Sequence, residues 1–167
     1  MQRWLTLLLF LVHMASPAWA KVPQGVIAEG DVEGVQAYRL ANGLRVLLVP
    51  EPSASSLTVE VAYSVGSRHE GYGEAGMAHL LEHLMFKGTV RFPKPDEEID
   101  RRGGGWNAET EVDQTRYYQT HLPSEENLRI ALSIEADRMT QVRFRQADLS
   151  REFQVVRNEL ELADSDP

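Results

Sequence analysis

The stretch from Gly76 to Thr89, GMAHLLEHLMFKGT, constrains this chain more than any other. It contains His79, Glu82 and His83. Residues three and four apart share one face of a helix, so both imidazoles and the carboxylate lie on the same side. Two neutral imidazoles can bind one zinc ion, and a nearby glutamate can take a proton from a water that the ion holds. The stretch therefore predicts a metal site with a base beside it, although helical histidine pairs also occur without any ligand.

Residues 1–20 predict export. Arg3 supplies a positive start, residues 5–12 form an apolar run, and residues 18–20 read Ala-Trp-Ala, a small-residue cleavage site. The apolar run is much shorter than the roughly 20 residues of a spanning helix, so we expect a cleaved signal peptide and no stable membrane span afterwards. The expected location is the periplasm in a two-membrane bacterium and the external medium otherwise.

The net charge of −8 and the absence of cysteine narrow the classes of function. An acidic chain is a poor partner for nucleic acid phosphates, so we expect no nucleic-acid partner. An exported protein without thiols is stabilised by its core, and its metal ligands are restricted to His, Asp or Glu. At 167 residues the chain is long enough to bury one such core.

Three strands are predicted before the motif. The segment 21–34 shows little periodicity and is expected to form an exposed arm. The runs 35–40 and 44–49 flank an Asn-Gly pair, which is favoured in type I′ turns, and they predict a hairpin. Apolar residues alternate over 57–65, which predicts a half-buried strand.

A second hairpin is predicted after the motif. A short helix over 96–102 is closed by three glycines and is followed by strands at 106–110 and 115–122. The glycines and the small Ala108 would let an extended peptide lie along the first of these strands. An ordinary strand preceded by a bulge fits the same pattern.

Two helices are predicted at the end of the sequence. The first begins after Ser124, and its apolar residues at helical spacing are expected to face the core. These residues are Leu128, Ala131, Leu132, Ala136 and Met139. The second begins near residue 148 and places Glu152 and Glu159 on one face, beside an apolar stripe. A catalytic zinc usually has three protein ligands, and acids beside an apolar stripe need an interior partner, so Glu159 is our candidate for the third ligand. The alternative is two solvated carboxylates, which we prefer for Glu161.

Four stretches of the sequence resemble one protein family. HLLEHLMFKGT at 79–89, with VGSRHE before it, resembles the inverted zinc motif of the pitrilysin/insulinase metallopeptidases, which include the mitochondrial processing peptidases. LANGLRVLLVP, GGGWNAETEVDQTRYY and REFQVVRNELEL resemble further family segments in the same order. The separation of His83 from Glu159 also matches the family. The likeness covers most of residues 35–167.

Carried over by position, the resemblance implies that His79, His83 and Glu159 bind one zinc ion per chain. It also implies that Glu82 is the general base, which activates the zinc-bound water.

Three further residues take implied roles from the resemblance. Glu152 matches a family glutamate that would orient a ligand. Asn107 and Ala108 match the strand on which the family holds its peptide substrate. The implied fold is α+β, a mixed or antiparallel sheet with helices on one face, of the processing-peptidase-like type.

The activity implied is that of a zinc endopeptidase acting on oligopeptides or small proteins outside the cytoplasm. Family members enclose the substrate between two halves, whereas this sequence stops soon after Glu159. We therefore expect residues 35–167 to form an incomplete N-terminal metallopeptidase domain that a C-terminal half or a partner subunit completes. Two alternatives stay open: a chain that binds zinc or peptide without cutting unless a partner is present, and a truncated product that folds poorly.

Overall fold

The computed structural model describes residues 22–165, so the signal peptide expected over residues 1–20 lies outside the described part. The chain divides between Pro52 and Ser53 into two compact units. The first hairpin thus belongs to the same unit as the segment before it. The sequence instead predicted one domain over residues 35–167. Between residues 22 and 165, no helix has the length and apolar character needed to cross a bilayer.

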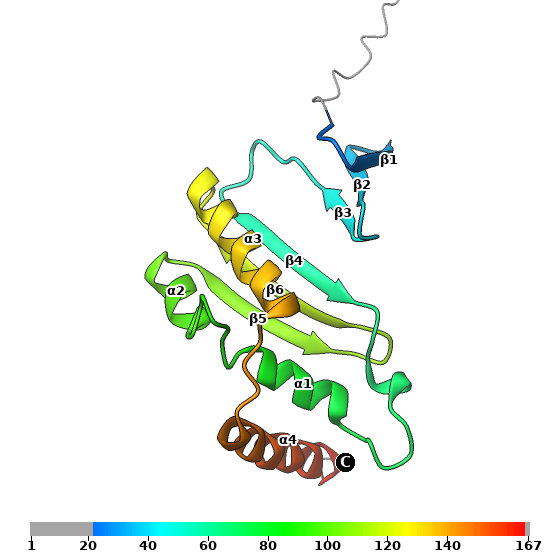
Figure 1. Ribbon diagram of the computed structural model, residues 1–167, viewed down its shortest axis with the longest axis vertical. Coiled ribbons are helices and arrows are strands. Elements are labelled where there is room, and N and C mark those ends of the chain that lie inside the picture. Colours follow the sequence, from blue (N-terminus) through cyan, green and yellow to red (C-terminus); the bar gives the residue numbers. More distant parts are fainter. Residues whose placement is uncertain (1–21, 166–167) are drawn as a thin grey trace, which may run out of the picture. The chain divides into compact units, whose positions relative to one another are not determined.

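The first unit is an antiparallel sheet in the order β1-β2-β3, formed by Val26–Val32, Val35–Leu40 and Arg45–Leu48 (Figure 1). Within the segment 21–34, expected as an exposed arm, the structure has β1, and most of its residues are exposed. The strand is held by backbone pairing with β2 and by Glu29, whose carboxylate forms ion pairs with Arg39 and Arg45. Such cross-strand pairs leave no apolar periodicity in the sequence.

Two turns of the first unit differ from the expectation. Asn42-Gly43 belongs to a three-residue loop, in which the N–H of Gly43 donates to the carbonyl of Leu40 (2.9 Å) and only the glycine has a positive φ, 91°. This is a type I turn followed by a glycine bulge rather than the predicted type I′ turn. The two-residue turn with both φ values positive is Glu33-Gly34, at 53° and 87°. Glutamate seldom adopts positive φ, so the sequence carries little signal for that turn.

The second unit packs helices on an antiparallel sheet, which confirms the α+β fold class (Figure 1). The sheet order is β4-β6-β5. In chain order the elements are β4 (Leu57–Tyr63), a 3-10 turn (Ser67–His69), α1 (Met77–Met85), α2 (Pro95–Arg101), β5 (Gly105–Thr110), β6 (Thr115–His121), α3 (Glu125–Thr140) and α4 (Gln146–Ser165). The central strand β6 buries every second residue, so one face of the sheet meets the core.

The inward face of α3 is largely polar, so the predicted core stripe was wrong except at Ala131. Leu132 is 52% exposed, and Leu128, Ala136 and Met139 are also exposed. The buried face instead carries Glu135 and Arg138, whose side chains pair at 3.1 Å, and Gln119 of β6 donates to Glu135 at 2.7 Å. Charged residues can be buried when they are paired and hydrogen-bonded. Apolar spacing alone therefore identified the wrong face of this helix.

Helices α1 and α4 lie side by side (Figure 1) and pack through Leu80, Leu84 and Val156. Gly76 precedes α1 with φ 86°, and a Cβ at this position would lie 2.9 Å from the side chain of Leu160. Glycine therefore permits both the left-handed conformation and the close approach of α4. This packing brings the side chains of α4 to the motif on α1.

Candidate metal centre

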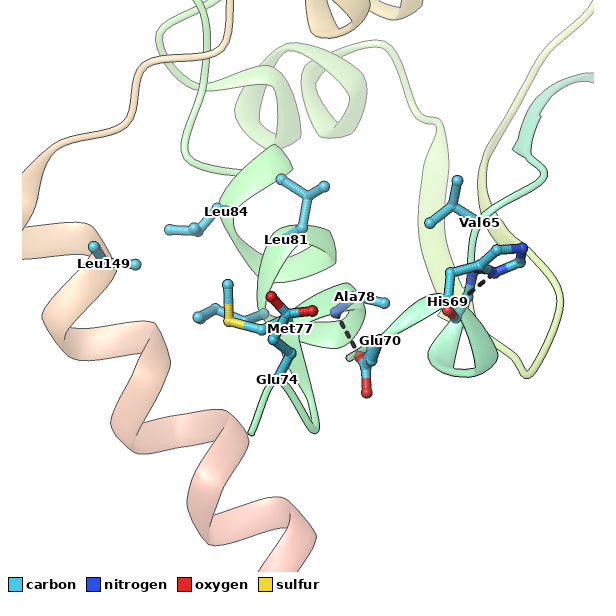
Figure 2. A pocket seen from close by; sticks show the side chains of 11 residues that line it. Val65, His69, Glu70, Glu74, Met77, Ala78, Leu81, Leu84 and Leu149 are labelled. Carbon is cyan, nitrogen blue, oxygen red and sulfur yellow. Dashed lines mark hydrogen bonds between the residues drawn. The ribbon is translucent and has the colours of Figure 1, made fainter. Parts of the chain in front are cut away.

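The first turn of α1 is held by a carboxylate from the loop before it. Glu70 accepts hydrogen bonds from the backbone N–H groups of Gly76 (3.0 Å) and Ala78 (2.8 Å), the second of which is drawn in Figure 2. The first N–H groups of a helix have no partner within it, and a negative charge near them is favourable. Glu70 thus fixes the start of the helix that carries the motif.

The C-terminal end of α1 is held by the segment that follows it. Gly88 has φ 89°, and a Cβ there would lie 2.3 Å from the carbonyl oxygen of Pro93, so this position requires glycine. The buried hydroxyl of Thr89 donates to Asp137 of α3 at 2.7 Å. Both ends of the motif helix are therefore anchored by specific contacts.

The two imidazoles of the motif face each other and a carboxylate from α4. The Nε2 atoms of His79 and His83 are 3.2 Å apart, and Oε2 of Glu159 lies 3.4 Å from the first and 3.6 Å from the second. A tetrahedral zinc with ligands at about 2.0–2.1 Å has ligand atoms about 3.3–3.4 Å from one another. The three donor atoms therefore fit one zinc ion, and the structure brings together all three residues predicted as ligands.

Glu152 lies behind His83, on the side away from the donor atoms. Its Oε2 accepts a hydrogen bond from Nδ1 of His83 at 3.0 Å, and its Oε1 pairs with Nζ of Lys87 at 2.8 Å. A proton on Nδ1 leaves the lone pair of His83 on Nε2, toward His79 and Glu159. Burial by itself raises the pKa of Glu152, but the hydrogen bonds from Lys87 and His83 outweigh it and lower that pKa below its usual value. Glu152 is therefore placed to orient His83 as a charged acceptor.

Glu82 lies beside the two imidazoles and is buried, with 9% of its surface exposed. The ligand atoms of His79, Glu82 and His83 lie within 4.8 Å of one another. The hydroxyl of Thr110 on β5 donates to Oε2 of Glu82 at 2.5 Å. One carboxylate oxygen of Glu82, Oε2, is thus held by β5.

Asn107 and Ala108 lie on β5, which is an edge strand in the part of the chain that the structure describes. Asn107 is exposed, and its side-chain amide donates to the hydroxyl of Tyr118 at 3.3 Å. The methyl group of Ala108 is buried and packs in one cluster with Met85 and Tyr117. The small size of Ala108 therefore lets α1 approach the strand, a reason that the sequence did not indicate.

The free edge of β5 exposes the backbone of alternate residues. The N–H of Glu111 donates to the carbonyl of Gln114 at 2.8 Å, so this pair is a hydrogen-bonded pair of the hairpin. In an antiparallel ladder such pairs alternate with pairs whose N–H and C=O groups point away from the partner strand. Trp106, Ala108 and Thr110 therefore direct these groups to the open edge.

A separate apolar pocket of about 320 Å³ lies on the other face of α1. Met77, Leu81 and Leu84 line it from the helix and Leu149 lines it from α4 (Figure 2). His79, His83 and Glu159, which carry the three atoms that fit a zinc ion, do not line this pocket. The chemistry of the site is thus carried by the polar face of α1.

Lys87 and Thr110 were missed in the sequence analysis. Lys87 follows His83 by four residues, a spacing that places two helical side chains on one face and so offered a signal. Thr110 offered none, because its contact with Glu82 joins a strand to a helix.

Comparisons with known proteins identify the family of the chain. Residues 45–167 match the family described as Insulinase (Peptidase family M16). The chain is 39% identical over 137 residues to an uncharacterized zinc protease of Rickettsia bellii (strain RML369-C). The aligned residues make up 81% of this chain and 33% of that relative. The chain thus spans about a third of that relative's length.

The solved structures that are similar to the chain include the following two proteins. One is a protease from Helicobacter pylori, with a TM-score of 0.69 and 38% identity over 75% of this chain and 30% of that one. The other is pitrilysin, with a TM-score of 0.68 and 31% identity over 81% of this chain and 15% of that one. With a family match over residues 45–167 and the same fold in these proteases, the chain belongs to the insulinase family, peptidase family M16.

Proposed function

We propose that this chain provides the zinc site of a metalloendopeptidase. The observation that carries the proposal is the set of three donor atoms, on His79, His83 and Glu159, spaced 3.2–3.6 Å apart beside the buried carboxylate of Glu82. These three residues would hold one zinc ion, which when bound polarises a peptide carbonyl and eases removal of a proton from water. The description of the Rickettsia relative as a zinc protease supports this assignment.

Glu82 is the general base in this proposal. Its Oε1 takes a proton from the attacking water while Oε2 stays hydrogen-bonded to Thr110. The water oxygen forms a bond to the peptide carbonyl carbon, the carbon–nitrogen bond then breaks, and Glu82 gives its proton to the departing amine nitrogen. The carboxylate is thereby returned to its starting state.

The substrate that fits this site is an extended peptide. Such a peptide would add to the open edge of β5, where backbone groups of Ala108 and its alternate neighbours are directed outward and Asn107 is exposed. A chamber of two halves requires polypeptide outside these 167 residues, and we propose that a C-terminal half or a partner subunit provides it. The mass of the protein in its own cells, probed with an antibody to residues 124–159, distinguishes these sources.

We propose export as the route to the site of action, on the basis of the signal-like residues 1–20. N-terminal sequencing of the protein recovered outside the cytoplasm should begin at residue 21. A protein that retains Met1 or stays in the cytoplasm would refute this part of the proposal.

The test of the activity compares the unaltered protein with Glu82→Gln and His79→Ala. We expect zinc-dependent peptide hydrolysis that a chelator abolishes, loss of hydrolysis with retained zinc in Glu82→Gln, and loss of both in His79→Ala. Loss of zinc from Glu82→Gln would contradict the division of roles. Zinc binding without hydrolysis in the unaltered protein would favour a non-catalytic or partner-dependent function.

A further inference from the structure

We propose that Thr110 is a positioning residue that holds the general base and ties it to the strand along which the substrate lies. This inference rests on the proposed function, because it takes Glu82 as the base and β5 as the docking edge. It adds a residue whose side chain and backbone act on two different partners.

The side chain of Thr110 contacts Glu82 directly. Its hydroxyl donates to Oε2 at 2.5 Å, within a site where Glu82 is only 9% exposed. A hydrogen bond to a charged acceptor is stronger than one between neutral groups, and a buried oxygen without its donor is unfavourable. The contact therefore restricts the carboxylate to an orientation that leaves Oε1 for the proton.

The strand that carries Thr110 is packed firmly against α1. Ala108 lies in one cluster with Met85, and the rings of Trp106 and Phe86 have centroids 4.6 Å apart. Both contacts join β5 to the helix of the base. Movement of Thr110 relative to Glu82 is thus limited by neighbours on the same strand.

The partner strand holds the same position from the other side. Thr115 of β6 is paired with Thr110, is buried, and donates from its hydroxyl to the carbonyl of Val65 at 2.9 Å. The end of the hairpin is thereby fixed to the loop after β4. Thr110 is accordingly held in place by packing that does not depend on its own hydroxyl.

The backbone of Thr110 is directed to the open edge of β5, as derived above from the alternation of the hairpin. A peptide that pairs with this edge would exchange hydrogen bonds with Thr110 and Ala108. The same residue then contacts the substrate backbone through its main chain and the base through its hydroxyl. Pairing along β5 consequently sets which carbonyl of the peptide faces Glu82.

The experiment uses the protein in the form in which it occurs in its cells, with a peptide that it cleaves. Thr110→Val removes the hydroxyl with little change of shape, and Thr110→Ser keeps it. Thr120→Val is a matched control on β6, where Thr120 is half-buried and its hydroxyl lies 3.0 Å from that of Thr58. The readouts are kcat, KM, zinc content and the cleaved bond identified by mass spectrometry. Thr110→Ala replaces the valine variant if the latter does not fold.

We expect kcat of Thr110→Val to fall about 10- to 100-fold, with KM within about twofold and zinc content unchanged, because a misplaced base slows the reaction without weakening binding. Thr110→Ser and Thr120→Val should behave like the unaltered protein.

Three results would overturn the inference while the proposed function stands: an unchanged kcat in Thr110→Val, an equal loss in Thr110→Ser, or zinc loss in Thr110→Val. Failure of the proposed function looks different, because the unaltered protein would then show no hydrolysis that a chelator removes, or Glu82→Gln would remain active.

Discussion

Replacement of Glu152 by glutamine tests the orientation of His83 most directly. The change keeps the shape of a side chain that is 7% exposed and removes its charge. Glutamine can still accept a hydrogen bond from Nδ1 of His83, but its amide group would face the ammonium of Lys87, where donor meets donor. The substitution therefore weakens the support of one proposed zinc ligand without touching the donor atoms.

The size of the effect follows from the hydrogen bond of 3.0 Å between His83 and Glu152. A bond to a charged group contributes about 1.5–3 kcal/mol and a neutral one about 0.5–1.5 kcal/mol. If the metal-bound imidazole loses this difference of about 1–1.5 kcal/mol, the dissociation constant for zinc becomes roughly tenfold larger. Loss of an outer partner of a metal-bound histidine commonly costs about 10- to 100-fold in affinity, which agrees with this value.

The assay is zinc competition against a chromogenic chelator, with circular dichroism to verify folding. Glu161→Gln is the matched control, because Glu161 lies on the same helix, is exposed, and pairs with Arg157 at 3.3 Å. We expect the control to bind zinc as the unaltered protein does. A folded Glu152→Gln protein whose zinc affinity equals that of the control would refute the role of Glu152.

Three other predictions concern stability. Glu70→Ala removes both hydrogen bonds to the start of α1 and should lower the free energy of unfolding by about 1–2 kcal/mol in urea titration; no change would contradict the capping role. Gly88→Ala should lower the free energy of unfolding more than Gly73→Ala does. Both glycines have positive φ, which costs an alanine about 1–2 kcal/mol, but only at Gly88 would the added Cβ also clash with backbone. Equal losses in the two variants would refute the clash. Burial, and to a smaller extent the charge of Arg102, lower the pKa of His121 below 6.5 in the folded protein. The unfolded protein therefore binds a proton more readily, so the free energy of unfolding should fall as the pH drops from 6.5 through the folded pKa. His121→Gln should lack this fall, and parallel pH profiles of the two proteins would refute the prediction.

The helix around the motif could be predicted because its signals are local. The spacing of His79, Glu82 and His83 depends only on the period of a helix, and the flanking glycines mark its ends. The same is true of the hairpin formed by β5 and β6, where alternation and a polar turn lie within a few residues of one another. The strands predicted at 106–110 and 115–122 lie at 105–110 and 115–121 in the structure.

Local signals failed where the deciding contact was not apolar. The inward face of α3 carries Glu135 and Arg138, whose burial depends on their pairing with each other and with Gln119. The type I′ turn fell at Glu33-Gly34, although the favoured turn sequence stands at Asn42-Gly43. At α3, pairing between buried polar groups outweighed the apolar spacing.

The sequence by itself determined the chemistry available to this protein: two imidazoles and a carboxylate on one helical face, no thiols, and acids spaced two turns apart on a later helix. Only the tertiary structure decided how these groups meet. The position of Glu159 at 3.4 Å from His79 depends on the packing of α4 against α1, and the contact of Thr110 with Glu82 depends on the packing of β5 against the same helix. Helical period acts between near neighbours, whereas these distances result from burial of apolar surface between segments far apart in the chain.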